Sequence, residues 1–196
     1  MKKITLVLLS ICCTLLSYAQ VKSGDAALDK RLAAYLKANE EKDFETVMDY
    51  MHPKLFKLAP RQALISAMKS AFESDEMEIN LSGLAITKAE TTSFKSGGSE
   101  YRKVEYRMTM KIKFIDTTVY EPEFIEQMTG LYKETFESKK VTYDAKSKTF
   151  IISGTDILYA IKDAGKEWLF LGYKNDPDMI KKLFSKEVAD HYKMME

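Results

Sequence analysis

The strongest constraint on the fold is a strict alternation of apolar and polar side chains between Lys103 and Phe114. A period of two residues is typical of a β-strand that buries one of its faces. At about 3.3 Å per residue the segment would span about 40 Å, so we expect the strand to bend. The side chains on the apolar face are Val104, Tyr106, Met108, Met110, Ile112 and Phe114.

Residues 77–87 supply the predicted partner strand, which is joined to the first through the turn at residues 96–99. Its apolar positions change parity at Ser82-Gly83. A change of parity beside a glycine predicts a β-bulge, which bends and twists a sheet. Further strands are predicted at residues 141–143, 149–162 and 167–173, with a hairpin turn at residues 163–166.

Helices are predicted before, within and after this series of strands. Apolar residues spaced by three and four positions indicate three helices in the first third of the chain, capped by Asp25, by Asp43 and by Pro60. A helix at residues 122–137 is inserted between strands, and a last helical region starts at Asp176-Pro177 and breaks at Ser185.

This order predicts an α+β fold. We expect a strongly bent antiparallel β-sheet with the N-terminal helices packed on its concave face, and a cone-like shape with an apolar interior. The inserted helix and the C-terminal helices complete it. We expect the C-terminal helices to cover the mouth of the cone with Ile180, Leu183, Phe184 and Val188.

The N-terminus has the features of a secretory signal peptide. Lys2 and Lys3 precede an uncharged run at residues 4–16, and Ala19 marks the predicted cleavage position. The alternative is a lipid-anchored chain that uses Cys12 or Cys13, although the preceding Ile11 is larger than the residue usual there. Cleavage would leave residues 20–196 as a single domain without a transmembrane anchor, because the apolar run is too short to span a bilayer.

The predicted mature chain has no cysteine, so its stability would come from its core and not from disulfides. Removal of Lys2 and Lys3 from 30 basic residues leaves 28, against 29 acidic residues. This balance gives no electrostatic case for nucleic-acid binding. Two distant histidines without cysteine make a transition-metal site unexpected, and no phosphate-binding or dinucleotide-binding motif suggests a cofactor.

Two segments resemble a known superfamily. Residues 33–56, AAYLKANEEKDFETVMDYMHPKLF, are similar to the opening helices of nuclear transport factor two-like domains. Residues 141–174, VTYDAKSKTFIISGTDILYAIKDAGKEWLFLGYK, resemble their closing hairpin, in which a tryptophan follows a glycine-lysine turn. The resemblance is closest to small exported members from Gram-negative bacteria and implies a periplasmic or secreted location. Because that superfamily includes isomerases, dehydratases, transport factors and many domains without a known activity, the fold alone implies no activity.

Candidate site residues follow from the predicted cone. Asp49, Tyr50 and His52 have the side chains of an acid–base cluster, but their spacing favours a helix end, so we expect His52→Ala to cost little stability. Asp156 or a tyrosine would be the alternative catalytic group inside the cone, although a kink-stabilising Asp156 is the simpler reading. The residues predicted to line a pocket are Met48, His52, Tyr106, Met108, Tyr159 and Trp168.

These features favour a non-catalytic binding domain for a small apolar ligand or a protein partner. The enzyme alternative is an isomerase or dehydratase that uses an Asp or His base with a tyrosine. The third alternative is a scaffold in which the outer face of the sheet forms a homodimer. That face carries Lys103, Arg107, Lys111 and Lys113, which would either bind an anionic glycan or lipid headgroup or simply face solvent and prevent edge pairing.

Overall fold

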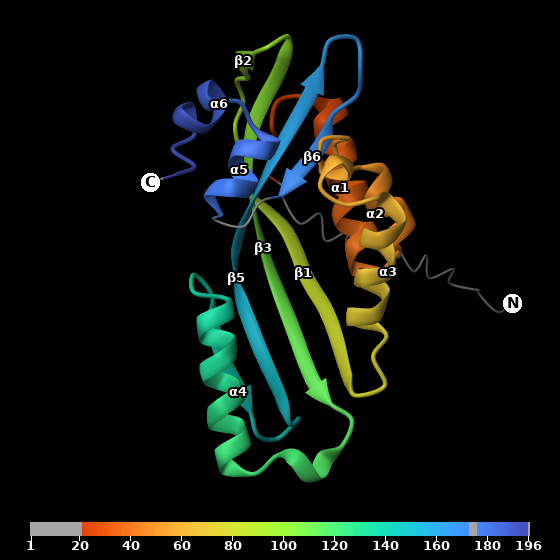
Figure 1. The fold of residues 1–196 in the computed structure, drawn as a ribbon, viewed down its shortest axis with the longest axis vertical. Coiled ribbons are helices and arrows are strands. Elements are labelled where there is room, and N and C mark those ends of the chain that lie inside the picture. Colours follow the sequence, from red (N-terminus) through yellow and green to blue (C-terminus); the bar gives the residue numbers. More distant parts are fainter. Residues whose placement is uncertain (1–20, 173–175, 196) are drawn as a thin grey trace, which may run out of the picture.

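The computed structural model describes residues 21–172 and 176–195. The predicted signal peptide at residues 1–19 lies outside the described residues, as do residues 173–175. The described chain forms an α+β fold with an open, six-stranded antiparallel sheet (Figure 1). Its α-helices are α1 (Ala26–Glu40), α2 (Phe44–Asp49), α3 (Arg61–Phe72), α4 (Pro122–Thr135), α5 (Pro177–Leu183) and α6 (Lys186–His191), with short 3-10 helices at Leu55–Lys57 and Thr117–Val119.

Four strands form the body of the sheet in the order β1-β3-β5-β4. The short strand β2 pairs with β3, and β6 pairs with β5. The strands are β1 (Met77–Ala89), β2 (Phe94–Ser96), β3 (Ser99–Phe114), β4 (Lys140–Asp144), β5 (Thr149–Asp163) and β6 (Leu169–Gly172). In Figure 1 the long strands β3 and β5 run the length of the molecule and carry separate groups of helices at their two ends.

The alternating segment is the central strand β3, as predicted. It pairs with β5 in unbroken register from Ser99 to Ile112, whereas its register with β1 shifts between Ser82 and Ala85. The predicted bulge is therefore confirmed, and Gly83 occupies it with a φ of 65°. A left-handed φ is accessible to glycine without steric strain.

The helix ends follow the predicted caps. Asp25 accepts hydrogen bonds from the N–H groups of Ala27 and Leu28, and Asp43 accepts one from Thr46. Asp176 caps α5, which ends at Leu183, and Ser185 caps α6, so the predicted break at Ser185 is confirmed. Short polar side chains at these positions satisfy amide donors that the first helical turn leaves unpaired.

The N-terminal helices cover one face of the upper half of the sheet (Figure 1). Leu28, Leu32 and Phe44 pack against Val104 of β3 and Phe170 of β6. These side chains are at most 2% exposed, so this cluster forms a close-packed core. We name it the N-terminal core.

Helices α5 and α6 cover the opposite face of the same half of the sheet. Tyr159 and Ile161 of β5 point to these helices, whereas their neighbours Leu158 and Ala160 point to the N-terminal core. Ile180, Leu183, Phe184 and Val188 are buried as predicted, but they do not cover the mouth of a cone. That prediction is wrong because successive strand residues face opposite sides of the sheet, and the helices dock on the outer one.

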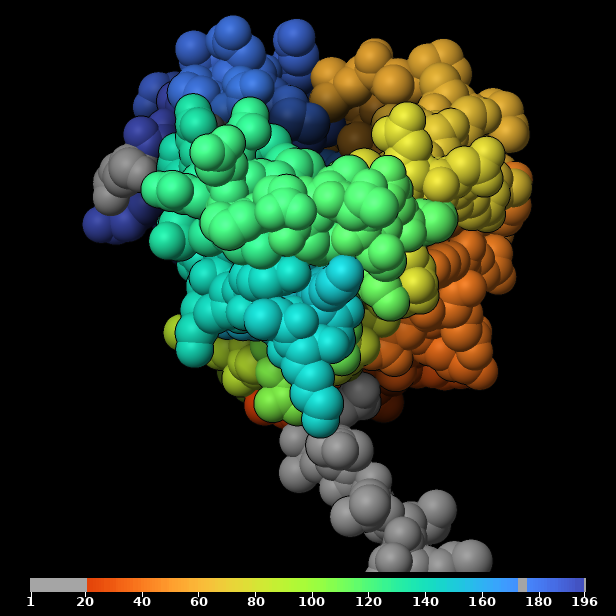
Figure 2. Space-filling model, turned by 90° about the horizontal axis from the view of Figure 1, so that it is seen from below, coloured from red at the N-terminus to blue at the C-terminus, as the bar shows by residue number. Residues whose placement is uncertain are grey.

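The lower half of the sheet is covered by α4. Tyr132 of this helix packs with Ile112, Phe150 and Ile152 in a separate cluster, which we name the lower core. Figure 2 views the molecule from this end and shows the segment from the end of β3 through α4 in front, with the N-terminal helices to one side. The inward face of the sheet is therefore divided between two cores and does not line one continuous cone.

Part of the outer face that a predicted homodimer would use is already covered by α5 and α6. On the outward face of the lower half, Lys111 and Lys113 are exposed, and Thr109, Ile151 and Ser153 are partly exposed. In the described part of the chain, no helix combines the length and the apolar character required to span a bilayer.

Candidate functional site

A cleft lies on the inward face of the sheet, between the N-terminal core and the lower core. Its volume is about 140 Å³, and it is partly open to solvent. Helix α1 forms one wall, and β1 and β3 form the other. The lining residues are Tyr35, Leu36, Asn39, Leu81, Leu84, Tyr106, Met108 and Met110.

The β-bulge shapes the cleft wall. Within the bulge, the N–H of Leu84 donates to the Oε1 of Glu40 at the end of α1, at 2.9 Å. This bond links the irregular part of β1 to the helix and holds Leu84 beside the cleft. Bulges often redirect side chains, and this one, predicted from the sequence, places Leu84 in the lining of the cleft.

The floor of the cleft continues into a group of polar side chains. Tyr106 lies directly opposite Asp156 in the β3–β5 ladder, and Met108 lies opposite Gly154. The Nζ of Lys139, from the segment between α4 and β4, is 2.5 Å from the Oδ1 of Asp156. The Lys139 side chain is only 8% exposed, so this ion pair is largely desolvated on the lysine side.

Gly154 makes room for this lysine. A Cβ atom at position 154 would lie 2.9 Å from the Cγ of Lys139, which is closer than carbon atoms normally approach. The absence of a side chain therefore lets the lysine stem lie on the strand and reach Asp156. The ladder with β3 continues through Asp156 without a register shift.

Burial raises the pKa of both tyrosines that line the cleft, Tyr35 and Tyr106. It raises the pKa of Tyr35 to about 12, with a further increase from the charge of Asp156, while a hydrogen bond with Asn39 acts in the opposite direction. Burial also raises the pKa of Tyr106, and the nearby Tyr35 and Asp156 add to this effect. Both phenols stay protonated at neutral pH and are available as hydrogen-bond donors.

Two of the six predicted pocket residues line this cleft, namely Tyr106 and Met108. Met48 and Trp168 lie in the N-terminal core at 5% and 1% exposure. Tyr159 faces the opposite side of the sheet, where it contacts the rings of Phe184 and Tyr192. The six residues therefore do not meet in one pocket.

His52 marks a junction between α2 and the sheet. Its backbone N–H donates to the carbonyl of Phe170 at 2.8 Å, and the N–H of Phe170 donates to the carbonyl of Tyr50. Residues 50–52 therefore extend the sheet beside β6, with a parallel bridge at Met51. The end of the helix at this position agrees with the prediction. The His52 side chain, however, is only 5% exposed, and this burial does not support the expectation that its removal costs little stability.

The imidazole of His52 lies beside Asp163, with 3.5 Å between Nε2 and Oδ2, and its Nδ1 accepts a hydrogen bond from the N–H of Lys54. Ser99 donates to the other oxygen of Asp163 at 2.7 Å. A nucleophilic triad needs the histidine between serine and aspartate, whereas here the aspartate lies between them. Burial lowers the pKa of His52, and Asp163 partly offsets this effect.

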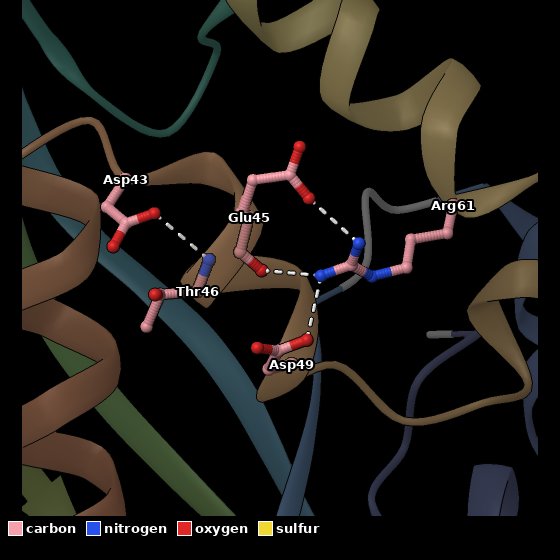
Figure 3. A network of polar contacts seen from close by, with 5 residues as sticks. All are labelled: Asp43, Glu45, Thr46, Asp49 and Arg61. Atoms are coloured by element: carbon pink, nitrogen blue, oxygen red, sulfur yellow. Dashed lines mark hydrogen bonds and ion pairs between the residues drawn. The ribbon is translucent and has the colours of Figure 1, made fainter.

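Asp49 does not join His52. Its Oδ1 accepts a hydrogen bond from the Nη2 of Arg61 at 2.7 Å, and the same guanidinium contacts the side chain and the carbonyl of Glu45 (Figure 3). The Asp49 side chain is 70% exposed, so this network fixes the start of α3 to α2 at the surface. Asp49 and His52 thus take part in two separate structural contacts and not in an acid–base cluster, in line with the helix end that their spacing favoured.

Trp168 has a structural role at the start of the domain. Its Nε1 donates to the Oδ2 of Asp25 at 3.0 Å, and the guanidinium of Arg102 lies 5.2 Å from its ring centroid. The same Asp25 carboxylate caps α1, so the tryptophan ties the closing hairpin to the first helix.

A second hollow, of about 580 Å³, lies between the two hairpin ends near Gly98 and Gly165. It is larger and more open than the cleft, and charged residues of both signs line it, including Lys162, Lys166 and Asp163. Its chemistry is that of a solvated surface, so we place the candidate site at the smaller, mostly apolar cleft.

Sequence reasoning missed Tyr35 and Lys139. Tyr35 was assigned only to the apolar face of the first helix. Lys139 had one indirect signal, because Gly154 and Asp156 interrupt the inward apolar series of β5 at neighbouring positions. Among the described residues, no group of three or more histidine, cysteine or acidic side chains is arranged to hold a metal ion.

No protein-family model matches the chain, and no curated protein matches it. The assignment to the nuclear transport factor two-like superfamily therefore remains a prediction that rests on the two segments quoted above.

Proposed function

We propose that the chain is an exported, non-catalytic binding domain of the nuclear transport factor two-like kind, and that it holds a small apolar ligand in the middle cleft. One observation carries the proposal: the two cores do not meet on the inward face of the sheet. The apolar residues that line the space between them are Leu36, Leu81, Leu84, Met108 and Met110, and the polar ones are Tyr35, Asn39 and Tyr106. Ligand sites typically combine an apolar lining with a few such polar groups.

The size of the cleft limits the ligand. A cavity of about 150 Å³ holds one benzene molecule, so a cleft of about 140 Å³ accepts a short acyl or alkyl chain or a single ring. Methionine supports this role because its unbranched side chain adapts to ligands of varied shape. A larger ligand would extend past Leu81 and Leu84, which are only partly buried.

The contacts of the acidic groups favour binding over catalysis. A general base needs a carboxylate or imidazole that is free to accept a proton from the substrate. Asp156 is held by Lys139, and His52 lies in a packed junction beside Asp163. The polar groups that line the cleft are the two tyrosines and Asn39, and the tyrosine hydroxyls can donate hydrogen bonds to a ligand.

Native mass spectrometry of the exported protein tests the proposal. We expect a co-purified small molecule, or one equivalent of added 1-hexanol, to remain bound under gentle ionisation. A Leu84→Trp variant should lose this bound mass because the larger side chain fills the cleft. The matched control is Leu131→Trp, since Leu131 lies on the exposed face of α4 at 49% exposure. A bare mass for the native protein with 1-hexanol present, or retention of the ligand by the Leu84 variant, would contradict the proposal.

A further inference from the structure

Next to Tyr106, which lines the cleft, one positive and one negative charge already compensate each other. Lys139, from the segment between α4 and β4, and Asp156 of β5 form an ion pair. Tyr106 stands opposite Asp156 on the neighbouring strand. Directly opposed residues on a sheet have Cβ atoms about 5 Å apart, so a ligand that reaches the Tyr106 ring approaches the Asp156 carboxylate.

Binding of a ligand carboxylate beside Tyr106 would be unfavourable. It would lose hydration on entry, it would approach Asp156, and the ammonium group that could compensate it is engaged already. A hydroxyl or amide group loses much less hydration free energy than a carboxylate and is not repelled by Asp156. It can donate a hydrogen bond to Asp156 and accept one from a tyrosine hydroxyl, which offsets the loss. Desolvation without a free counter-charge therefore selects against an anion.

We propose, building on the proposed function, that the ligand of this cleft ends in an uncharged hydroxyl or amide group, as in a short alcohol, and not in a carboxylate. The site would thus separate neutral amphiphiles from the corresponding fatty acids. Lys139 acts here as the counter-ion of Asp156, and Gly154 is the position that lets it do so.

The raised pKa values of the two tyrosines indicate the same preference of the cleft for uncharged groups. Burial, with a contribution from Asp156, raises the pKa of Tyr35 to about 12 and also raises that of Tyr106. On ionisation, each tyrosine would place a negative charge in the cleft, and burial and the charge of Asp156 disfavour that ionisation. A ligand carboxylate at the same place would meet the same desolvation and the same negative charge.

The test compares two probes that share one chain, 1-hexanol and hexanoate, by calorimetric titration at pH 7. We expect 1-hexanol to bind at least tenfold more tightly to the native protein. In an Asp156→Asn variant, Lys139 loses its counter-ion and becomes free to pair with a carboxylate. We therefore expect the preference to shift toward hexanoate by at least tenfold, with circular dichroism used to check that the variant is folded.

The outcomes separate this inference from the proposed function. If hexanoate binds the native protein as tightly as 1-hexanol, the inference is wrong and the binding proposal stands. An unchanged ratio in a folded Asp156→Asn variant would also overturn it, because the ion pair would then have no part in selection. If neither probe binds, the binding proposal itself fails, and this inference fails with it. The comparison on the native protein decides the question even if the variant does not fold.

Discussion

The two halves of the sheet differ in how many of their faces are covered. In the upper half, α1–α3 pack on one face and α5–α6 on the other, so Tyr159 and Phe170 are fully buried. In the lower half, α4 covers only the inward face, and the outward side chains contact solvent. The same pair of long strands, β3 and β5, runs through both halves.

This difference explains where the cleft lies. The upper half gains its stability from two layers of helices, and the lower half from one helix packed on a sheet face. Between them, neither group of helices extends far enough to cover the inward face, so Tyr106 and Met108 are left to line an open space. The candidate site is thus a gap between two cores on one continuous sheet.

Removal of residues 176–196 is expected to have the largest effect on the upper half. The four side chains Ile180, Leu183, Phe184 and Val188 are buried, and burial of each contributes about 1.5–3 kcal/mol. The total, roughly 6 kcal/mol or more, is comparable to the stability of a typical domain. Urea unfolding should show a destabilised or unfolded protein that binds anilinonaphthalene sulfonate strongly. A truncated protein with native stability would show that the second layer contributes nothing.

A matched pair of isoleucines compares the outward faces of the two halves. Ile161 lies under α5 and α6 at 1% exposure, whereas Ile151 lies on the lower half and is only partly buried. We expect Ile161→Ala to reduce the free energy of unfolding by about 2–4 kcal/mol, and Ile151→Ala by less than about 1 kcal/mol. Chemical denaturation measures both values. Equal losses would mean that the lower outward face is covered in solution, for example by a second copy of the chain.

His52 allows a smaller, pH-dependent test of the upper half. Its pKa is lowered in the folded protein by burial, with smaller effects from the neighbouring lysines Lys54 and Lys166, while Asp163 opposes the shift. The folded state therefore favours the neutral imidazole, and its stabilisation is present above pH 6.5 and is lost as the pH falls below that value.

Stability should accordingly fall between pH 7 and pH 5.5, and a His52→Gln variant should lose less over the same interval. The exposed residue His191 provides the control, because His191→Gln leaves the buried junction intact. A native protein whose melting temperature rises as the pH is lowered would contradict the assignment of a neutral His52.

Much of this architecture was predictable, because strands and caps are local features. The alternation in residues 103–114 identified the central strand, and the parity change at Gly83 located the bulge. The packing of α5 and α6 on the outward face of β5 was harder to predict from the sequence. Residues 157–161 are apolar without interruption, which is typical of a strand buried on both faces, but their helices were placed over a cone mouth instead.

The cleft was not predictable because it depends on distances between elements that are remote in sequence. Tyr35 and Tyr106 are separated by 71 positions, and nothing in either local pattern indicates that the space between them is open. Lys139 stands beside Lys140 in a polar segment, and the sequence gives no reason to distinguish the two. Only the packing of α4 directs one of them to Asp156.

Nuclear magnetic resonance of protein with ¹³C-labelled methionine methyl groups tests the central claim most directly. With 1-hexanol bound, we predict nuclear Overhauser contacts from the alkyl protons to the methyl groups of Met108 and Met110, which line the cleft. Met48 and Met194, which are buried in other clusters, should show none. Contacts to Met48 or Met194 in place of Met108 and Met110 would contradict the claim that the gap between the two cores is the binding site.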